Sequence, residues 1–117
     1  MLEDKATELG RLIGQSPEYE AIKRANDALA QDGEATELLR QIDALRRQAQ
    51  SMIDRGEEPG PGMDEQLDKL LSTVQRQSVY QRAVAAQENF DKTMLRINEA
   101  LLDGMKRGAT SPIITLG

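Results

Sequence analysis

The side chains most often used for catalysis near neutral pH are missing from this chain of 117 residues, which contains no histidine and no cysteine. Histidine exchanges protons near neutral pH and is the commonest metal ligand, while cysteine supplies the thiolate of nucleophilic, zinc and iron–sulfur sites. Serine and cysteine triads, histidine-based zinc sites and cysteine-ligated clusters are therefore excluded. We expect a protein that is not an enzyme, with no catalytic residues, metal or cofactor.

Acidic residues are the remaining candidates for a metal site. They form two clusters, Glu57–Glu58 and Asp64–Glu65–Asp68. Neither cluster has the alternating oxygen ligands of a calcium loop. Solubility and a favourable interaction with the positive end of a helix dipole explain these acids better.

The sequence Gly-Pro-Gly at residues 60–62 begins like a phosphate-binding loop. A P-loop needs a preceding strand and a lysine that reaches the phosphates, and this segment has neither. The nearby acids Asp64 and Glu65 would also repel a phosphate. The segment is better explained as a linker, because proline lacks an amide donor and breaks helices.

Arg40 and Arg47 are the candidates for contact with RNA or with an acidic partner, because they lie two helical turns apart in the most basic stretch of the chain. Acidic residues are interspersed among these arginines, so an exposed face of ion pairs is the alternative explanation. The formal net charge of −5 and the presence of only two tyrosines and one phenylalanine argue against direct nucleic-acid binding.

The elements that carry these residues are all predicted to be helices. Apolar residues recur at spacings of three and four in five segments, approximately residues 2–13, 17–30, 33–55, 64–74 and 78–107. The boundaries have recognisable signals: Ser16 and Pro17 start the second segment, Asp32 caps the third, and Gly56 ends it. Ser78 is the predicted cap of the last.

These segments predict an all-α fold, an elongated bundle of about five helices with two long helices and coiled-coil-like packing. We expect residues 1–109 to form one domain, with a loop at residues 56–62, and residues 110–117 to form a tail. The uncharged, β-branched tail could be a docking peptide or a frayed terminus. Neither a signal peptide nor an apolar run of ~20 residues is evident, so we expect a cytoplasmic protein without a membrane span.

The last helix is too long for a compact fold. Roughly 29 residues at 1.5 Å each extend ~43 Å, whereas a compact chain of this size is only ~35 Å across. Its main apolar stripe is interrupted by Gln87, which could fix the register of an assembly or reach solvent. Beyond Met94 the helix is apolar over a wide arc, so we expect the first two helices and a second subunit to cover different parts of it. The expected partner or oligomer interface consists of Phe90, Met94, Leu95, Ile97, Leu101, Leu102 and Met105.

Residues 9–19, Leu-Gly-Arg-Leu-Ile-Gly-Gln-Ser-Pro-Glu-Tyr, followed by Lys23, Ala25 and the turn at Asp32, resemble the bacterial YlbF/YmcA family. The order of a long third helix, a break at residues 56–58, a shorter helix and a long final helix also agrees. The resemblance implies an all-helical regulator that assembles with itself or with paralogues. In some bacteria such proteins act with the endoribonuclease RNase Y on RNA processing, competence, sporulation and biofilm formation.

Some complexes of this family are associated with iron–sulfur clusters held by cysteines, and this chain has no cysteine to contribute. We therefore expect a non-enzymatic regulatory adaptor that acts through helix-mediated contacts. It would be a homo-oligomer, as a dimer, or a hetero-oligomer with paralogues, and a ribonuclease could be a further partner. The alternative is a small helical chaperone whose methionines, at Met52, Met94 and Met105, offer an adaptable apolar surface.

Overall fold

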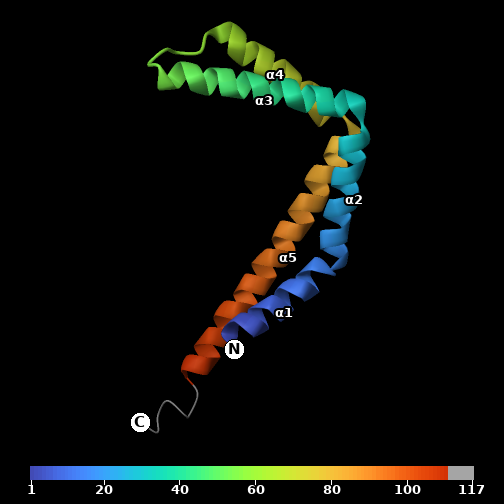
Figure 1. The fold of residues 1–117 in the computed structure, drawn as a ribbon, viewed down its shortest axis with the longest axis vertical. Coiled ribbons are helices and arrows are strands. Elements are labelled where there is room, and N and C mark those ends of the chain that lie inside the picture. The colour runs from blue at the N-terminus through green and yellow to red at the C-terminus, as the bar shows by residue number, and fades with distance from the viewer. Residues whose placement is uncertain (111–117) are drawn as a thin grey trace.

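The computed structural model describes residues 1–110, and these residues form five helices with no strand. The helices are α1 (Leu2–Gly14), α2 (Pro17–Gln31), α3 (Gly33–Asp54), α4 (Pro61–Gln75) and α5 (Ser78–Ala109) (Figure 1). The predicted all-α fold with two long helices is confirmed, since α3 has 22 residues and α5 has 32. Within the described residues, no helix is both long and apolar enough to cross a membrane.

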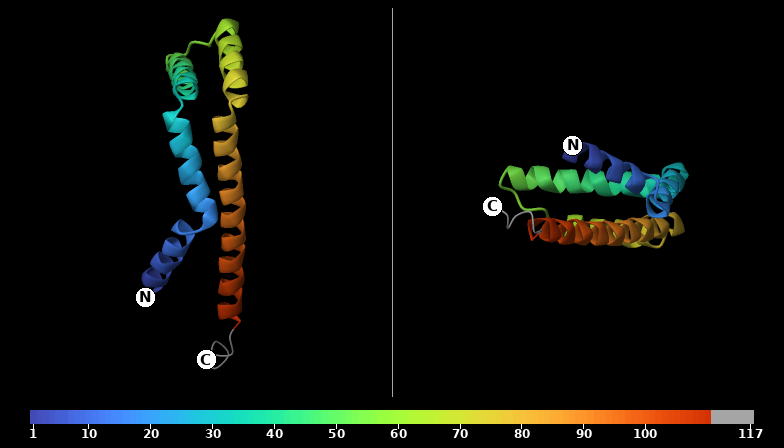
Figure 2. Two further views of the ribbon diagram at one scale, coloured as in Figure 1. Left: turned by 90° about the vertical axis from the view of Figure 1, so that its right-hand side faces the viewer. Right: turned by 90° about the horizontal axis from the view of Figure 1, so that it is seen from below.

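The helices form two arms that meet at a corner (Figure 1). In one arm α2 packs antiparallel to the first part of α5, and in the other α3 and α4 form an antiparallel hairpin. The preceding helix, α1, bends away from the line of α2 and diverges from the end of α5 (Figure 2). The molecule measures 68 × 37 × 21 Å, and its radius of gyration is 21.6 Å. A compact chain of this length would have a radius of about 13 Å, so the elongated shape is confirmed.

Local capping explains where α2 and α3 begin. The hydroxyl of Ser16 accepts a hydrogen bond from the amide of Tyr19 at 3.2 Å, and Pro17 occupies the first helical position. Asp32 caps α3 by accepting a hydrogen bond from the amide of Ala35 at 2.8 Å. Each cap satisfies an amide that has no partner within its own helix. After α3 the chain turns at Gly56, whose φ of +79° is readily adopted only by glycine.

The start of α4 differs from the prediction, because the helix begins at Pro61 rather than near Asp64. Proline is well suited to the first position of a helix, where a missing amide hydrogen breaks no bond and the fixed φ is already helical. Pro61 and Gly62 of the predicted 56–62 loop therefore belong to α4.

The last helix also differs slightly from the prediction. Gln77, not Ser78, is the residue that precedes the first turn of α5, and no side chain caps that turn. The helix continues to Ala109, past the predicted end near Arg107. The predicted tail comprises residues 110–117. Of these, Thr110 directly follows α5, and residues 111–117 lie outside the described part of the chain.

The core is small because each arm is only two helices thick. Among the described residues, those with less than a tenth of their surface exposed are Ala35, Ile42, Leu45, Val74 and Ala86. Ile42 and Leu45 belong to the apolar spacing that predicted the helix over residues 33–55, and their burial shows the side of α3 that faces α4. On α5 the buried position is Ala86, whereas Gln87 is exposed and donates a hydrogen bond to Asp91 on the same helix at 2.9 Å. Gln87 therefore reaches solvent.

Short connections and cross-helix hydrogen bonds hold the corner. A single residue, Asp32, separates α2 from α3, and only Arg76 and Gln77 separate α4 from α5. The hydroxyl of Thr36 donates to the carbonyl of Leu29 at 3.2 Å, and Gln77 donates to the carboxylate of Glu34 at 3.3 Å. The two arms are therefore joined by two short crossings that lie side by side.

Candidate functional site

The predicted interface residues of α5 fall into three groups, which differ in the part of the chain that lies against them. Phe90 is half-buried and faces Tyr19 of α2 within the α2–α5 arm, with ring centroids 5.6 Å apart and planes tilted by 60°. This tilted geometry is a favourable one for aromatic pairs. Phe90 is therefore engaged within the chain, where it joins the start of α2 to the middle of α5.

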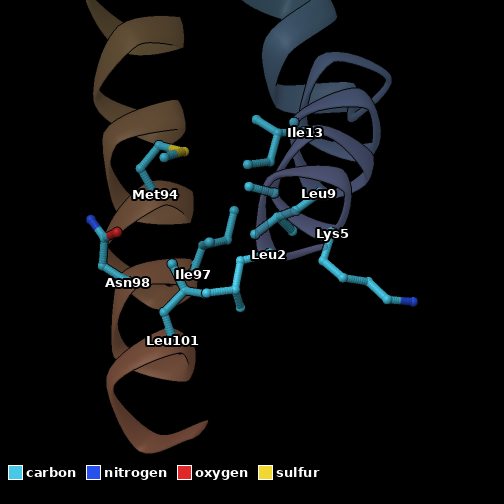
Figure 3. Close-up of a pocket in the computed structure, with 10 residues that line it drawn as sticks. Leu2, Lys5, Leu9, Ile13, Met94, Ile97, Asn98 and Leu101 are labelled. Carbon is cyan, nitrogen blue, oxygen red and sulfur yellow. The ribbon is translucent and has the colours of Figure 1, made fainter. Parts of the chain in front are cut away.

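A second group lines a cleft where α1 diverges from α5. The cleft has a volume of about 650 Å³. Its lining residues are Leu2, Lys5, Ala6, Leu9, Gly10, Ile13, Met94, Ile97, Asn98 and Leu101. Figure 3 shows the apolar side chains of the two helices pointing toward one another, with the polar ends of Lys5 and Asn98 directed away from the centre. The result is an open apolar groove.

The third group lies further around α5 and is left uncovered. Leu95, Leu102 and Met105 expose 60%, 56% and 68% of their surface. We call these three residues the α5 ridge. The predicted apolar arc beyond Met94 is therefore real, and α1 and α2 cover only part of it.

The interface residues predicted from the sequence did not include the α1 side of the cleft. The apolar spacing in residues 2–13 predicts the helix that carries Leu2, Leu9 and Ile13, but it does not show which part of α5 these side chains approach. Ala6 and Gly10 are also small, so a groove rather than a filled seam remains between the helices. The apolar spacing of the first helix, together with its small residues, was the sequence feature that could have indicated this side of the cleft.

The predicted arginine pair is bound within α3. The guanidinium of Arg40 donates hydrogen bonds to both carboxylate oxygens of Glu37 at 2.6 and 2.9 Å. The amide of Gln41 donates a third, at 3.1 Å. The bonds from Arg40, then that from Gln41, lower the pKa of Glu37 from 4.5 to about 2. Arg47 forms an ion pair with Asp43 at 3.0 Å.

The three methionines considered for a chaperone surface do not lie together. Met52 is half-buried near the end of α3 in the hairpin arm, whereas Met94 lines the cleft and Met105 belongs to the α5 ridge. Within the described residues, no three acidic side chains come close enough to form a metal site. The concentration of apolar surface at the α1–α5 end is therefore the feature that stands out.

Comparison with known proteins agrees with this architecture. The family model described as "Control of competence regulator ComK, YlbF/YmcA" matches residues 2–106. A UPF0342 protein of Streptococcus pneumoniae (strain Hungary19A-6) is 30% identical over 76 residues, which cover 65% of this chain and 68% of that protein. The UPF0342 protein of strain D39 matches equally well.

The fold is also found in a solved structure, a protein of unknown function (DUF964) from Bacillus stearothermophilus. It is 19% identical in sequence and has a TM-score of 0.69, and the alignment covers 94% of this chain and 96% of the other. At this identity the likeness concerns the fold alone. The family match, in contrast, extends over all of α1 to α4 and most of α5. The chain therefore belongs to the YlbF/YmcA family, a family of regulators rather than enzymes, as its resemblance at residues 9–19 predicted.

Proposed function

We propose that this chain is a non-enzymatic regulatory adaptor that acts in the cytoplasm by packing its α1–α5 end against helices of other subunits. The observation that carries the proposal is the apolar surface at that end, where the cleft and the α5 ridge lie side by side. Exposed apolar patches of several hundred Å² usually mark sites of protein contact. Membership of a family described as controlling a competence regulator supports a regulatory role.

In this proposal, the protein that the adaptor contacts is a ribonuclease of the RNase Y type. The support for this partner is the family resemblance, which links such proteins to RNA processing. The chain would influence RNA through the ribonuclease and not by binding RNA itself. Arg40 and Arg47 support this distinction, because each is already paired with a carboxylate on its own helix. The net charge of −5 also opposes binding to phosphates.

Co-purification of the full chain with the ribonuclease of the same cell tests the proposal. Replacing Leu95 and Leu102 by glutamate places charge on the α5 ridge and should reduce recovery of the ribonuclease at least tenfold, because a charge buried in an apolar contact is strongly unfavourable. The matched control is Ile53→Glu, since Ile53 is a similarly exposed apolar residue, at 55%, in the hairpin arm.

Equal recovery of the ribonuclease with the native chain and with the Leu95→Glu, Leu102→Glu variant would contradict the proposed contact surface. Recovery of many unfolded proteins in place of a stoichiometric partner would favour the chaperone alternative.

Whether the chain binds RNA directly is tested separately, by measuring RNA binding at increasing salt concentration. Direct binding would weaken steeply with added salt, and the adaptor proposal expects no such salt-dependent RNA binding by the purified chain.

A further inference from the structure

The outer part of the cleft, nearest the end of α5, is less covered than the part near α2. Ile13 and Met94, which line the inner part, are half-buried. Leu2 and Leu101, which line the outer part, are 83% and 50% exposed. The two helices diverge toward this end (Figure 2). The outer part of the cleft therefore has apolar surface that a further segment of chain can cover.

The side of α5 that lines the cleft continues, beyond it, as glycine. Met94, Ile97 and Leu101 recur at spacings of three and four, and the next positions in this spacing are Gly104 and Gly108. At 3.6 residues per turn, both glycines lie within about 60° of Leu101 around the helix axis. We call these two residues the glycine track. It leads from the outer part of the cleft to the end of α5.

The described residues give no reason for glycine at these two positions. Both lie within α5, where glycine is a poorer helix former than alanine, and neither has a positive φ. Apart from chain neighbours and the local helix backbone, no described atom lies within 4 Å of the position that a Cβ would occupy at either residue. A glycine on a helix surface permits the close approach of another backbone. The track thus offers a path for an extended segment along α5.

The sequence that follows α5 is suited to this path. Residues 111–117 read Ser-Pro-Ile-Ile-Thr-Leu-Gly and contain no charged side chain. Proline cannot continue a helix, and it disfavours the helical conformation of the residue before it. The apolar residues that follow match a cleft in which the polar ends of the lining side chains point away from the centre (Figure 3).

The length of this segment matches the distance that it must cover. The path from Thr110 back to Leu101 measures ~14 Å along α5, at 1.5 Å per residue. From Thr110 to Leu116 an extended chain spans ~20 Å, at ~3.3 Å per residue. The excess of ~6 Å allows the chain to reverse its direction before it returns. Leu116 can therefore reach the outer part of the cleft, whereas the inner part lies beyond its range.

We propose that residues 113–116 occupy the outer part of the cleft of their own chain. After a reversal at residues 111–112, the segment returns along the glycine track and ends between Leu2 and Leu101. The cleft has a volume of about 650 Å³, within the ~300–1,000 Å³ of pockets that hold small ligands. This volume accommodates a few apolar side chains.

The alternation of an extended segment determines which side chains enter the cleft. Residues two apart point to the same side, so Ile114 and Leu116 form one set, and Ile113 and Thr115 form the other. The first set is entirely apolar and enters the cleft. The second set includes a hydroxyl and faces solvent. Because the groove is open, water can still bond to backbone groups on that side.

The docked segment makes the α1–α5 end self-covering. This consequence rests on the proposed function in one respect, that this end is the surface that contacts a partner. A partner that uses the cleft must displace residues 113–116 first. Its apparent affinity is lowered by the fraction of molecules in which the cleft is free. The segment is therefore an autoinhibitory contact.

Paired cysteines in the full chain test the docking, because the native chain has none. Leu101→Cys with Leu116→Cys should form a disulfide within one chain under mild oxidation, since the Cα atoms of a disulfide lie about 4.4–6.8 Å apart. The control pair is Glu99→Cys with Leu116→Cys. Glu99 is exposed at a similar distance from Thr110 but faces the opposite side of α5, so this pair should link at least tenfold more slowly.

Two outcomes of this experiment would overturn the docking. Equal rates of linkage for the two pairs would mean that the segment has no preferred site on α5. Linkage only between chains, seen as a disulfide-bonded dimer on a non-reducing gel, would mean that a second copy holds the segment.

A variant in the glycine track tests the path. Gly108→Leu, added to the pair at positions 101 and 116, should slow linkage at least tenfold, because the leucine occupies the space of the returning backbone. The matched control is Gly62→Leu, which adds the same side chain to an open helical position at the start of α4 and should leave linkage unchanged. Circular dichroism should show unchanged helix content, since leucine favours helix more than glycine does. Linkage as fast with Gly108→Leu as without it would contradict the path.

Recovery of the ribonuclease tests the autoinhibition. Ile114→Asp with Leu116→Asp should release the segment and raise recovery at least threefold, because the cleft is then free in every molecule. The control, Ile113→Asp with Thr115→Asp, adds the same charge to the other side of the segment and should leave recovery unchanged. Equal recovery with the two double variants would overturn the autoinhibition.

The two readouts separate this inference from the adaptor function. If no form of the chain recovers the ribonuclease, the adaptor proposal fails, and preferential linkage of positions 101 and 116 within one chain still supports docking of the segment. If that linkage is absent and the native chain recovers the ribonuclease, the docking fails and the adaptor proposal stands.

Discussion

Glu37 and Arg40 illustrate what the charged residues of this molecule do. The two side chains lie one helical turn apart on α3, and the bonds between them hold the pKa of Glu37 near 2, against an ordinary value of 4.5. Because the pKa is lower in the folded chain, the ionised carboxylate stabilises the fold above pH 4.5. This contribution is lost as the pH falls from 4.5 toward 2.

Replacing Arg40 by alanine should return the pKa of Glu37 most of the way to 4.5, because the remaining hydrogen bond from Gln41 is the smaller cause of the shift. Carboxyl carbon chemical shifts followed through an acid titration measure this directly. Arg47→Ala is the control, since Arg47 is paired with Asp43 and should leave Glu37 unaffected. An unchanged Glu37 titration in the Arg40→Ala variant would contradict the pairing.

At the scale of helices, the sequence predicts the elements better than their arrangement. Ser16, Asp32 and Gly56 act on neighbouring residues, so they mark helix ends without knowledge of the rest of the fold. The burial of Ala86 in place of Gln87, in contrast, depends on which side of α5 the second helix lies against. For the same reason, the α1 side of the cleft could not be assigned to α5 from spacing alone.

Val74 should be the most costly position in α4 to truncate, because it is the largest side chain that the described structure buries completely. Val74→Ala should destabilise the fold by about 2 kcal/mol, from the lost burial of two methyl groups and the cavity left behind. Urea denaturation measures this difference. Val84→Ala on α5 is the matched control, since Val84 is 39% exposed and should cost clearly less. Equal losses would show that the corner is not the packed part of the molecule.

At the scale of the whole molecule, the division into two thin arms is the dominant property. Two packed helices cover only the side chains that lie between them, which is why few described residues are fully buried. The two that are completely buried, Ala35 and Val74, lie at the ends of α3 and α4 next to the corner. The predicted length of the last helix indicated an elongated molecule, and this was correct. The direction of the hairpin arm was not predictable, because it is determined by the short crossings at Asp32 and at residues 76–77.

Small-angle X-ray scattering of the chain, extrapolated to a dilution at which it is monomeric, should give a radius of gyration close to the 21.6 Å of the structure. A chain that collapsed into a compact bundle would give about 13 Å. A value near that of the compact bundle would mean that the arms fold together and the open cleft closes in solution.

The paired crossings at the corner have a mechanical consequence. Two adjacent chain connections, reinforced by the bonds from Thr36 and Gln77, resist a change in the angle between the arms more than a single flexible linker would. The tip of the α3–α4 hairpin and the α1–α5 end are therefore held at a set separation along a body 68 Å long. Partners bound at these two ends would be kept apart by the body between them, so that the described residues 1–110 can set a distance as well as a contact.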